Sequence, residues 1–512
     1  MDAFADKLGR VGAWCGQNKY LGAIKNAFQN FMPATIAGAI GVLWTNVLVN
    51  DNVVEGNAQG LGGIFEPIMA LKPINDVFAA ISFCTISCIS IGIVMLVAQE
   101  IGEANGETGA FPAVLGFMSW AVVTPTTTNI WQGTDALASG AVLPAGTEAI
   151  TTVGGFEGSY LGATGLFTAL LVGIIALEIY NLFRKMDALK IKMPEQVPPG
   201  VARAFEVLIP TFLTLLVVGT IGWLVKLASG SYLNDLIKTS VQEPLMNIIG
   251  DNVIAVMFMY VLISLFWLVG IHGNNMLAAV KEPIFKPMLY ANTALFTDGK
   301  SVPLTPEIKA HGYYTFNLGM MQMFAEWGGS GVTLGLVIAI FIFSKREDNR
   351  AIATLSIVPG LFNINETVTF GIPLVLNPIL GIPFILAPVA CVALGWALIS
   401  MGFCPPVCIE VPWTMPPLFL GFLATGGSIM GAVSQLITTL ISYLSYFVVL
   451  SCATWPVLQG DFSAGNFFVA IGMIDQLSYP LISLAEIIRQ LVAIKPSCQS
   501  MEKFIEEGNA AR

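Results

Sequence analysis

The stretch PGLFNINETVTFGIPLVLNP, residues 359–378, places one carboxylate in a segment that is otherwise almost entirely apolar. Glu366 stands beside Asn363 and Asn365, and the twenty residues after Thr369 carry no charge. An ionisable side chain in a membrane interior costs about 2.5 to 3.5 kcal/mol on insertion scales, so it marks a candidate functional site. The two asparagines add amide donors and acceptors beside the carboxylate.

The stretch from Thr369 to Phe384 carries three prolines, at positions 373, 378 and 383. Proline removes a backbone donor and clashes with the preceding helical turn, so this density predicts an interrupted helix with free backbone groups. Broken backbone with Asn and Glu beside it is a common way to bind a polar ligand at membrane depth. We therefore predict a binding site around Glu366. The alternative is that Glu366 pairs with Lys345 or Arg346 at the membrane interface.

Composition places the chain among membrane proteins. Of its 512 residues, 55% are hydrophobic and only 11% are charged, whereas soluble domains carry about 25% charged residues. Apolar windows of roughly 20 residues, enough to cross a hydrocarbon core about 30 Å thick, recur along the chain. The sequence therefore predicts an all-α polytopic membrane protein. The predicted spans cover residues 31–49, 77–99, 110–125, 160–183, 207–228, 252–271, 331–343, 377–401 and 431–450.

Lysine and arginine mark the cytoplasmic side of membrane proteins. They occur in residues 1–30 and again in 184–203, while residues 73–183 contain none. We therefore predict that residues 1–30 form an amphipathic lead-in on the inner surface and that the 184–203 loop is also inside. A further basic cluster at 345–350 should lie inside too, although simple alternation of spans would place it outside.

This conflict predicts either an additional crossing within residues 311–329 or a re-entrant hairpin. The GGSG at 328–331 suits a tight hairpin tip, because glycine permits positive φ. Residues 281–310 are the longest balanced polar stretch in the centre of the chain. We interpret them as a loop, with a docking surface for a soluble partner as the alternative.

Two further positions are candidates for the same site. His272, in LFWLVGIHGNNML, is flanked by glycines and followed by Asn274 and Asn275, so this open turn offers backbone and amide groups to a hydroxyl-rich ligand. Trp413 lies beside a proline-fixed turn, and its rigid face suits stacking on a sugar ring, although aromatic residues at membrane boundaries are usually anchors. Glu410 lies three residues earlier, and the sequence does not separate a site role from a boundary role for it.

Other kinds of chemistry find no support in the sequence. Two histidines and eight scattered cysteines without a C-x-x-C pair form no zinc-site spacing. The sequence contains no P-loop, no G-x-S-x-G elbow and no H-E-x-x-H motif. No basic patch interleaved with aromatic residues predicts nucleic-acid binding.

Four long motifs together resemble one family. In chain order they are WLVGIHG (267–273), GGSGVTLGL (328–336), VPGLFNINETVTFGIPLVLNPILGIPFILAP (358–388) and VPWTMPPLFLGFLATGG (411–427). They look like the membrane-embedded IIC component of the sugar phosphotransferase system (PTS), in the lactose, cellobiose and diacetylchitobiose branch. The resemblance implies a multi-pass permease of the bacterial inner membrane with a cytoplasmic N-terminus. It further implies a homodimer of protomers with about ten transmembrane helices and two re-entrant hairpins each.

The resemblance also implies a division of the chain. After the lead-in of residues 1–30, residues 31–450 would form the IIC transport domain. Its scaffold helices would lie mainly in the N-terminal half, and its substrate-binding part mainly in residues 250–430. Residues 451–512 would be a C-terminal extension, whose apolar stretch at 466–488 fits either one more crossing or an interfacial helix.

The chemistry of the family implies roles for the candidate residues. A disaccharide such as cellobiose, diacetylchitobiose or lactose would enter from outside, and its C6 hydroxyl would attack a phosphoryl group carried on a cysteine of a soluble IIB protein. Glu366 would accept the hydroxyl proton and His272 would orient the nucleophile, while Asn365 and Trp413 would line the pocket. IIB and IIA are expected as separate chains, and no metal or other cofactor is expected.

Two positions depart from the family pattern. Thr367 replaces the proline that usually follows the motif glutamate, and Met415 replaces a frequent threonine. Both bear on which sugar is bound rather than on the type of reaction. Two other functions stay open: a secondary transporter that couples protons through Glu366, and a sugar sensor that no longer transports.

Overall fold

The computed structural model of the chain describes residues 10, 14, 17–50, 53–54, 57–58, 62, 65–131, 149–194, 196–250, 252–297, 311–344, 347–372, 374 and 378–459. These residues are almost entirely helical, which confirms the predicted all-α class. Within them the strands form two short antiparallel hairpins. The first pairs β1 (Val53–Val54) with β2 (Asn57–Ala58), and the second pairs β3 (Thr127–Trp131) with β4 (Ala149–Gly154).

Six helical segments among the described residues are long and apolar enough to cross a membrane. They are Lys19–Leu48, Glu66–Ser87, Ala163–Arg184, Pro199–Ser229, Leu380–Ser400 and Ile429–Val448. Two shorter apolar helices, Phe111–Val123 and Val253–Leu268, accompany them. Eight of the nine predicted spans overlap these segments, and the ninth, 331–343, overlaps a ten-residue helix at Leu334–Phe343. The total number of crossings stays a prediction.

The N-terminal half contains helices of very different length. In chain order they are α2 (Lys19–Leu43), η1 (Trp44–Leu48), η3 (Glu66–Ile74), α3 (Asn75–Ser82), η4 (Phe83–Ser87), α4 (Ile89–Ala104), α5 (Phe111–Val123), α6 (Gly158–Leu161), η6 (Ala163–Gly165), α7 (Leu166–Arg184), η7 (Asp187–Leu189), α8 (Pro199–Ser229), α9 (Leu233–Ile237), η8 (Lys238–Gln242), α10 (Glu243–Leu245) and η9 (Met246–Gly250).

The C-terminal half, which carries most of the candidate site, is also helical. Its elements are α11 (Val253–Leu268), α12 (Gly273–Thr297), α13 (Leu318–Ala325), α14 (Leu334–Phe343), α15 (Glu347–Leu361), α16 (Glu366–Gly371), α17 (Pro378–Ser400), α18 (Phe419–Ala424) and α19 (Ile429–Gln459).

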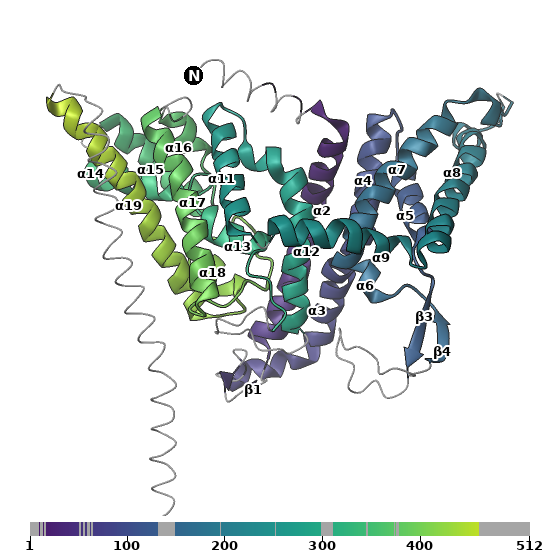
Figure 1. Ribbon diagram of the computed structural model, residues 1–512, viewed down its shortest axis with the longest axis horizontal. Helices are drawn as coiled ribbons and strands as arrows, with labels where there is room; N and C mark the ends of the chain where they lie inside the picture. The colour runs from purple at the N-terminus through teal and green to yellow at the C-terminus, as the bar shows by residue number, and fades with distance from the viewer. Residues whose placement is uncertain are drawn as a thin grey trace, which may run out of the picture.

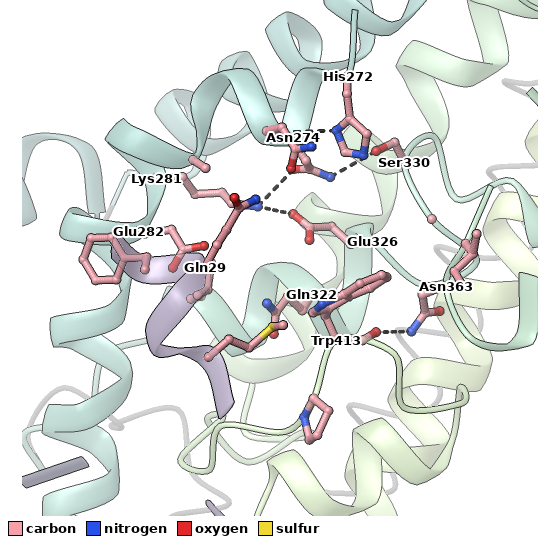
Figure 2. A pocket seen from close by; sticks show the side chains of 18 of the residues that line it. Gln29, His272, Asn274, Lys281, Glu282, Gln322, Glu326, Ser330, Asn363 and Trp413 are labelled. Carbon is pink, nitrogen blue, oxygen red and sulfur yellow. Dashed lines mark hydrogen bonds and ion pairs between the residues drawn. The ribbon is translucent and has the colours of Figure 1, made fainter. Parts of the chain in front are cut away.

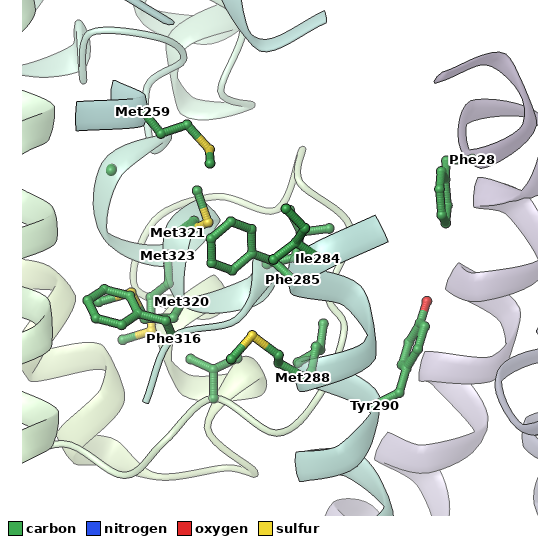
Figure 3. Close-up of a cluster of buried hydrophobic side chains, with 14 of the residues drawn as sticks. Phe28, Met259, Ile284, Phe285, Met288, Tyr290, Phe316, Met320, Met321 and Met323 are labelled. Atoms are coloured by element: carbon green, nitrogen blue, oxygen red, sulfur yellow. The ribbon is translucent and has the colours of Figure 1, made fainter. Parts of the chain in front are cut away.

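The elements gather in two groups with α2, α3 and α12 between them. Figure 1 shows α13 to α19 on one side and α4 to α9 on the other. Helix α12 begins beside the first group and runs across the centre, where it contacts α2. A methionine-rich cluster packs α11, α12 and α13 together (Figure 3), because flexible thioether side chains fill irregular gaps. Its buried members include Met259, Ile284, Phe285, Met288, Phe316, Met320, Met321 and Met323.

The structure corrects the interpretation of residues 281–310 as a loop. Helix α12 extends to Thr297, and residues 298–310 lie outside the described part. The prediction was wrong because α12 is polar in sequence yet mostly buried, including Lys281 and Lys286. Their charges are neutralised by carboxylates inside the protein rather than by water. Polarity therefore indicated buried ion pairs and not a loop.

Two other expectations need correction in detail. The span 77–99 is not one helix, because the backbone breaks at Cys88 between η4 and α4. Pro383 and Pro388 do not interrupt α17, which runs through both of them, as membrane helices with helical neighbours can. The predicted interruption does occur between α16 and α17, after Gly371.

The length of helix α13 tests whether residues 311–329 contain an additional crossing of the membrane. The eight residues of α13 extend about 12 Å, well short of a hydrocarbon core about 30 Å thick. A crossing by α13 alone is therefore excluded. A tight glycine turn follows it, with φ of 70°, 86° and 79° at Gly328, Gly329 and Gly331. The basic pair at 345–346 lies outside the described residues.

Candidate functional site

A cavity of about 630 Å³ opens between α2, α12, α13, the glycine turn 328–331 and the turns before α16 and α18. Every residue that the sequence predicted for the site lines this cavity. The seven that line it are His272, Asn274, Asn275, Asn363, Asn365, Glu366 and Trp413. They come from three separate parts of the sequence, so the fold itself brings them together (Figure 2).

His272 and Glu366 face each other at this cavity. His272 Nε2 lies 3.9 Å from Glu366 Oε1, and the two side chains are 37% and 46% exposed. His272 Nδ1 accepts a hydrogen bond of 3.2 Å from the backbone N–H of Asn275, so it caps the first turn of α12. A neutral histidine that accepts through Nδ1 carries its proton on Nε2. That proton points toward the space shared with Glu366.

The orientation of His272 is set by its neighbours. Gly270, with φ of 82°, turns the chain sharply after α11, a backbone conformation that glycine adopts without steric cost. The imidazole packs on the ring of Trp267, with 4.5 Å between ring centroids. Trp267 is fully buried, so the histidine rests on a rigid surface.

The Asn363 and Asn365 side chains bind backbone groups of the turns around the cavity. Asn363 accepts a hydrogen bond from Gly328 N (2.6 Å) and donates to the carbonyls of Trp413 and Met415. Asn365 donates to the carbonyl of Ser330 (3.0 Å) and to Thr369 Oγ1 (3.2 Å). Both asparagines are buried.

These bonds join two residues that precede Glu366 to the glycine turn and, through Asn363, to the Trp413 loop. Gly329 has no room for a side chain here, since a Cβ would lie 2.6 Å from Asn365 Cβ. Glu366 is therefore presented by a turn that is held in place directly before it. The donor groups of both asparagines are taken by protein acceptors.

Sequence reasoning missed a buried ion pair in the cavity wall. Lys281 Nζ donates to Glu326 Oε1 (2.6 Å) and to Asn274 Oδ1 (3.0 Å), and Tyr260 donates to the same Glu326 oxygen (2.9 Å). Asn274 in turn donates to Ser330 Oγ (3.1 Å). The pair thus reaches the first turn of α12 and the glycine turn. The sequence could have drawn attention to Glu326, because it is the only charged residue between positions 311 and 343.

A second charged group, farther along α12, was likewise not predicted as a unit. Lys286 Nζ lies 3.1 Å from Glu282 and 3.4 Å from Glu410, and Tyr290 donates to Glu410. The Lys286 ammonium also lies over the ring of Phe28 in α2. Glu410, which the sequence left between two roles, is therefore a cavity-lining residue with a lysine partner.

The four glutamates that line the cavity differ in their partners. Glu326, Glu282 and Glu410 each pair with a lysine. Glu366 has no lysine, arginine or hydrogen-bond donor within bonding distance among the described residues; the ionisable group that faces it is the imidazole of His272, at 3.9 Å. Glu366 can therefore accept a hydrogen bond or a proton from a ligand. No three metal-ligating side chains converge within the described part of the chain.

Comparisons with known proteins agree with this architecture. A family model described as "Phosphotransferase system, EIIC" matches residues 25–388. The chain is 32% identical over 468 residues to the cellobiose-specific EIIC component of the PTS of Lactococcus lactis subsp. lactis (strain IL1403), covering 85% of this chain and 94% of that protein. It is 30% identical over 431 residues to the oligo-beta-mannoside-specific EIIC component of Bacillus subtilis (strain 168), covering 84% and 88%.

A solved structure has the same fold. The crystal structure of the transporter ChbC, the IIC component from the N,N'-diacetylchitobiose-specific phosphotransferase system, superposes with a TM-score of 0.76 at 27% identity. The match covers 88% of this chain and 98% of that one. Together with the apolar helices, these relatives identify a multi-pass membrane protein.

Proposed function

We propose that this chain, which belongs to the EIIC family of the phosphotransferase system, binds a β-linked disaccharide in the cavity and presents one hydroxyl for phosphorylation. The relatives named for cellobiose, oligo-beta-mannoside and diacetylchitobiose support a substrate of this class. The cavity of about 630 Å³ is within the size range of small-molecule sites. Its exposed indole, Trp413, offers a face for a sugar ring.

The observation that carries the proposal is the contrast among the cavity carboxylates. Three lie within ion-pair distance of one of two lysines, while Glu366 has no such partner among the described residues and faces His272. A free carboxylate that is held in place by its neighbouring turns is suited to accept a proton from a sugar hydroxyl. Asn363 and Asn365, which precede it, are already bonded to the glycine turn and to the Trp413 loop, so they fix its position.

In the proposed reaction the hydroxyl oxygen attacks the phosphorus of a phosphocysteine on a IIB partner. The O–P bond forms as the S–P bond breaks, the hydroxyl proton passes to Glu366, and the thiolate leaves on IIB. Phosphoryl transfer relies mainly on positioning and charge stabilisation. This chain would supply positioning and the proton acceptor, with His272 orienting the hydroxyl, and IIB would supply the phosphoryl group. IIA would recharge IIB.

The finer arrangement follows the family. We place the protein in the bacterial cytoplasmic membrane with its N-terminus inside, as a homodimer whose sugar is loaded from outside and phosphorylated at the inner face. The basic residues 184–203 support this orientation, since lysine and arginine gather on the cytoplasmic side. Asn274, Asn363 and Asn365 would act by holding the turns around the sugar.

The test uses inside-out vesicles that contain the full chain, a phosphorylated cysteine-type IIB protein, and cellobiose, N,N'-diacetylchitobiose or lactose. The parent should form sugar 6-phosphate only when phospho-IIB is present. Glu366→Gln should lower the rate about 10²- to 10⁴-fold, the range for loss of a general base. The matched control is Glu206→Gln, since Glu206 is 49% exposed and lies 3.9 Å from Lys190, outside the cavity. It should leave the rate unchanged.

Other results would favour the remaining functions. Uptake of unmodified sugar that an uncoupler abolishes would replace this proposal with proton-coupled transport through Glu366. Sugar binding without uptake or product would indicate a sensor. Full activity of Glu366→Gln would remove the carboxylate from the mechanism.

A further inference from the structure

The polar side chains of the cavity wall divide into those with protein partners and those without. Lys281, Glu326 and Asn274 are bonded to one another, as are Lys286 and its two glutamates. Gln322 also lines the cavity and is half-buried, yet its carboxamide makes no hydrogen bond to any described residue. Its amide is not among the buried side-chain atoms that lack a partner, so it is open to the cavity. A ligand there can take over hydrogen bonds that the amide otherwise makes with water.

The position of Gln322 on α13 explains why it faces the cavity. Leu318, Gln322 and Glu326 follow at intervals of four residues and all line the cavity, since residues four apart share one face of a helix. The other residues of α13 are buried and apolar, and its three methionines belong to the cluster in Figure 3. Gln322 is thus the single polar side chain within α13, and it faces the cavity rather than the core.

The connections of α13 place Gln322 away from Glu366. Ser330, at the glycine turn, accepts from Asn365, the residue before Glu366. Glu326 precedes that turn, and Gln322 lies one helical turn, about 5.4 Å along the axis, before the position of Glu326. In Figure 2 Gln322 lies near the indole of Trp413 and far from His272. A ligand whose reacting hydroxyl is at Glu366 would bring its next sugar unit toward Gln322 and Trp413.

We infer that Gln322 is a specificity-determining residue that hydrogen-bonds the second sugar unit, the one beyond the unit whose hydroxyl reaches Glu366. This inference rests on the proposed function. A carboxamide both donates and accepts, so it matches a pair of neighbouring ring hydroxyls or a single acetamido group. Trp413 covers the ring face while Gln322 binds polar substituents on its edge.

The experiment compares ligands of two lengths on the purified full chain in detergent. Calorimetric titration first ranks cellobiose, N,N'-diacetylchitobiose and β-1,4-mannobiose on the parent, and the tightest is kept. The methyl β-glycoside of its monosaccharide serves as the short probe. Gln322→Met keeps an unbranched side chain of similar length without hydrogen-bonding groups. The matched control is Gln99→Met, at a half-buried glutamine of α4 outside the cavity.

Gln322→Met should weaken disaccharide binding about five- to tenfold, the effect of one neutral hydrogen bond. Binding of the methyl glycoside should stay unchanged, and Gln99→Met should bind both ligands like the parent. Unchanged disaccharide binding in Gln322→Met would overturn the inference, since the glutamine would then contact only water. An equal loss for both ligands would also overturn it, because Gln322 would then act on the first unit or on cavity shape.

Two controls keep the result interpretable. If Gln322→Met does not fold, as judged by size-exclusion chromatography and melting temperature, Gln322→Asn withdraws the carboxamide by one methylene. That variant should show the same selective loss. A parent that binds none of the disaccharides would overturn the proposed function itself, a result distinct from a parent that binds and a variant that binds equally well.

Discussion

Glu107 and Glu366 are carboxylates in two regions of the molecule that treat charge in opposite ways. Glu107, between α4 and α5, is 5% exposed and lies 2.9 Å from Arg184 and 2.6 Å from Arg203. Glu366, at the start of α16, is 46% exposed, and the imidazole of His272 faces it at 3.9 Å. The first carboxylate joins α7 and α8 to the α4–α5 connection. The second makes no ion pair with a lysine or arginine within the described part of the chain.

The difference shows which charges serve the fold and which are available to a ligand. A buried charge is tolerated only when partners and hydrogen bonds replace its lost hydration. Glu107 meets that condition with two arginines and the Tyr180 hydroxyl. The pair of Lys281 and Glu326 meets it as well, although it lines the same cavity as Glu366. A carboxylate that stabilises the fold is therefore distinguished from one available to a ligand by its cationic partner, and not by whether it lies at the cavity.

Removing one partner of the buried one-to-one pair in the cavity wall, Lys281 and Glu326, should have the largest effect. Lys281→Met leaves the carboxylate of Glu326 without its ammonium in a wall where the two side chains are 6% and 14% exposed. We expect a loss of about 3 kcal/mol in unfolding free energy, measured by denaturant titration in mixed micelles. Lys226→Met is the control, because its exposed contacts with the Tyr232 hydroxyl and ring should contribute no more than about 1 kcal/mol. Equal losses in both variants would contradict the comparison.

The Glu107 cluster should respond less strongly, since its arginines keep partial contact with water. Glu107→Gln leaves Arg184 and Arg203, which are 25% and 45% exposed, without their shared anion. We expect about 2 kcal/mol of destabilisation and unchanged sugar affinity of the folded protein. In the same assay Glu366→Gln should stay within about 0.5 kcal/mol of the parent, as exposed substitutions usually do.

The contrast between Glu107 and Glu366 would be contradicted if the stability changes of the two variants were exchanged. A stable Glu107→Gln protein together with an unstable Glu366→Gln protein would mean that Glu366 has a structural role. Its free oxygens would then not be evidence for ligand chemistry.

Much of the site could be predicted from sequence, because a charge in an apolar stretch is conspicuous. That reasoning located Glu366 and, with the family resemblance, the six other residues that the structure brings to the same cavity. The same reasoning, applied to residues 311–343, would have located Glu326. Partners were harder to predict, since Lys281 lies 45 positions before Glu326 and only the packing of α12 beside α13 joins them.

The sequence could not reveal what the asparagines bind. Asn363 follows the pattern of a ligand-binding amide, yet its partners are backbone groups 35, 50 and 52 positions away. Such contacts depend on how the turns meet in three dimensions. For the same reason residues 281–297 of α12 were taken for a loop: Lys281 and Lys286 have carboxylate partners on other elements, which periodicity alone does not show.

A smaller effect is expected where the glycine turn meets the Glu366 turn. Gly329→Ala puts a Cβ at φ of 86°, 2.6 Å from Asn365 Cβ, which should cost about 1.5 kcal/mol. Gly106→Ala is matched in φ, at 84°, but its Cβ would meet nothing within 4 Å. It should cost about 1 kcal/mol or less. Denaturant titration gives both values, and the phosphorylation rate should fall only in Gly329→Ala, because only there is the Glu366 turn displaced. Equal phosphorylation rates in the two variants would mean that the contact between Gly329 and Asn365 does not affect the function of Glu366.

The smallest effect is expected at Thr367, where the chain departs from the family motif. Thr367 is the second residue of α16, and its backbone N–H is among the first-turn donors that have no intrahelical acceptor. Helices α5 and α10 already carry proline at this same position. Thr367→Pro should therefore change the unfolding free energy by no more than about 0.5 kcal/mol.

Thr369→Pro is the contrasting variant, because it removes a hydrogen bond of 2.9 Å to the Asn365 carbonyl, and it should cost about 3 kcal/mol. If Thr367→Pro keeps its stability but changes which disaccharide binds best, the departure acts on specificity through the backbone of Glu366, because a residue before proline is biased toward extended conformations.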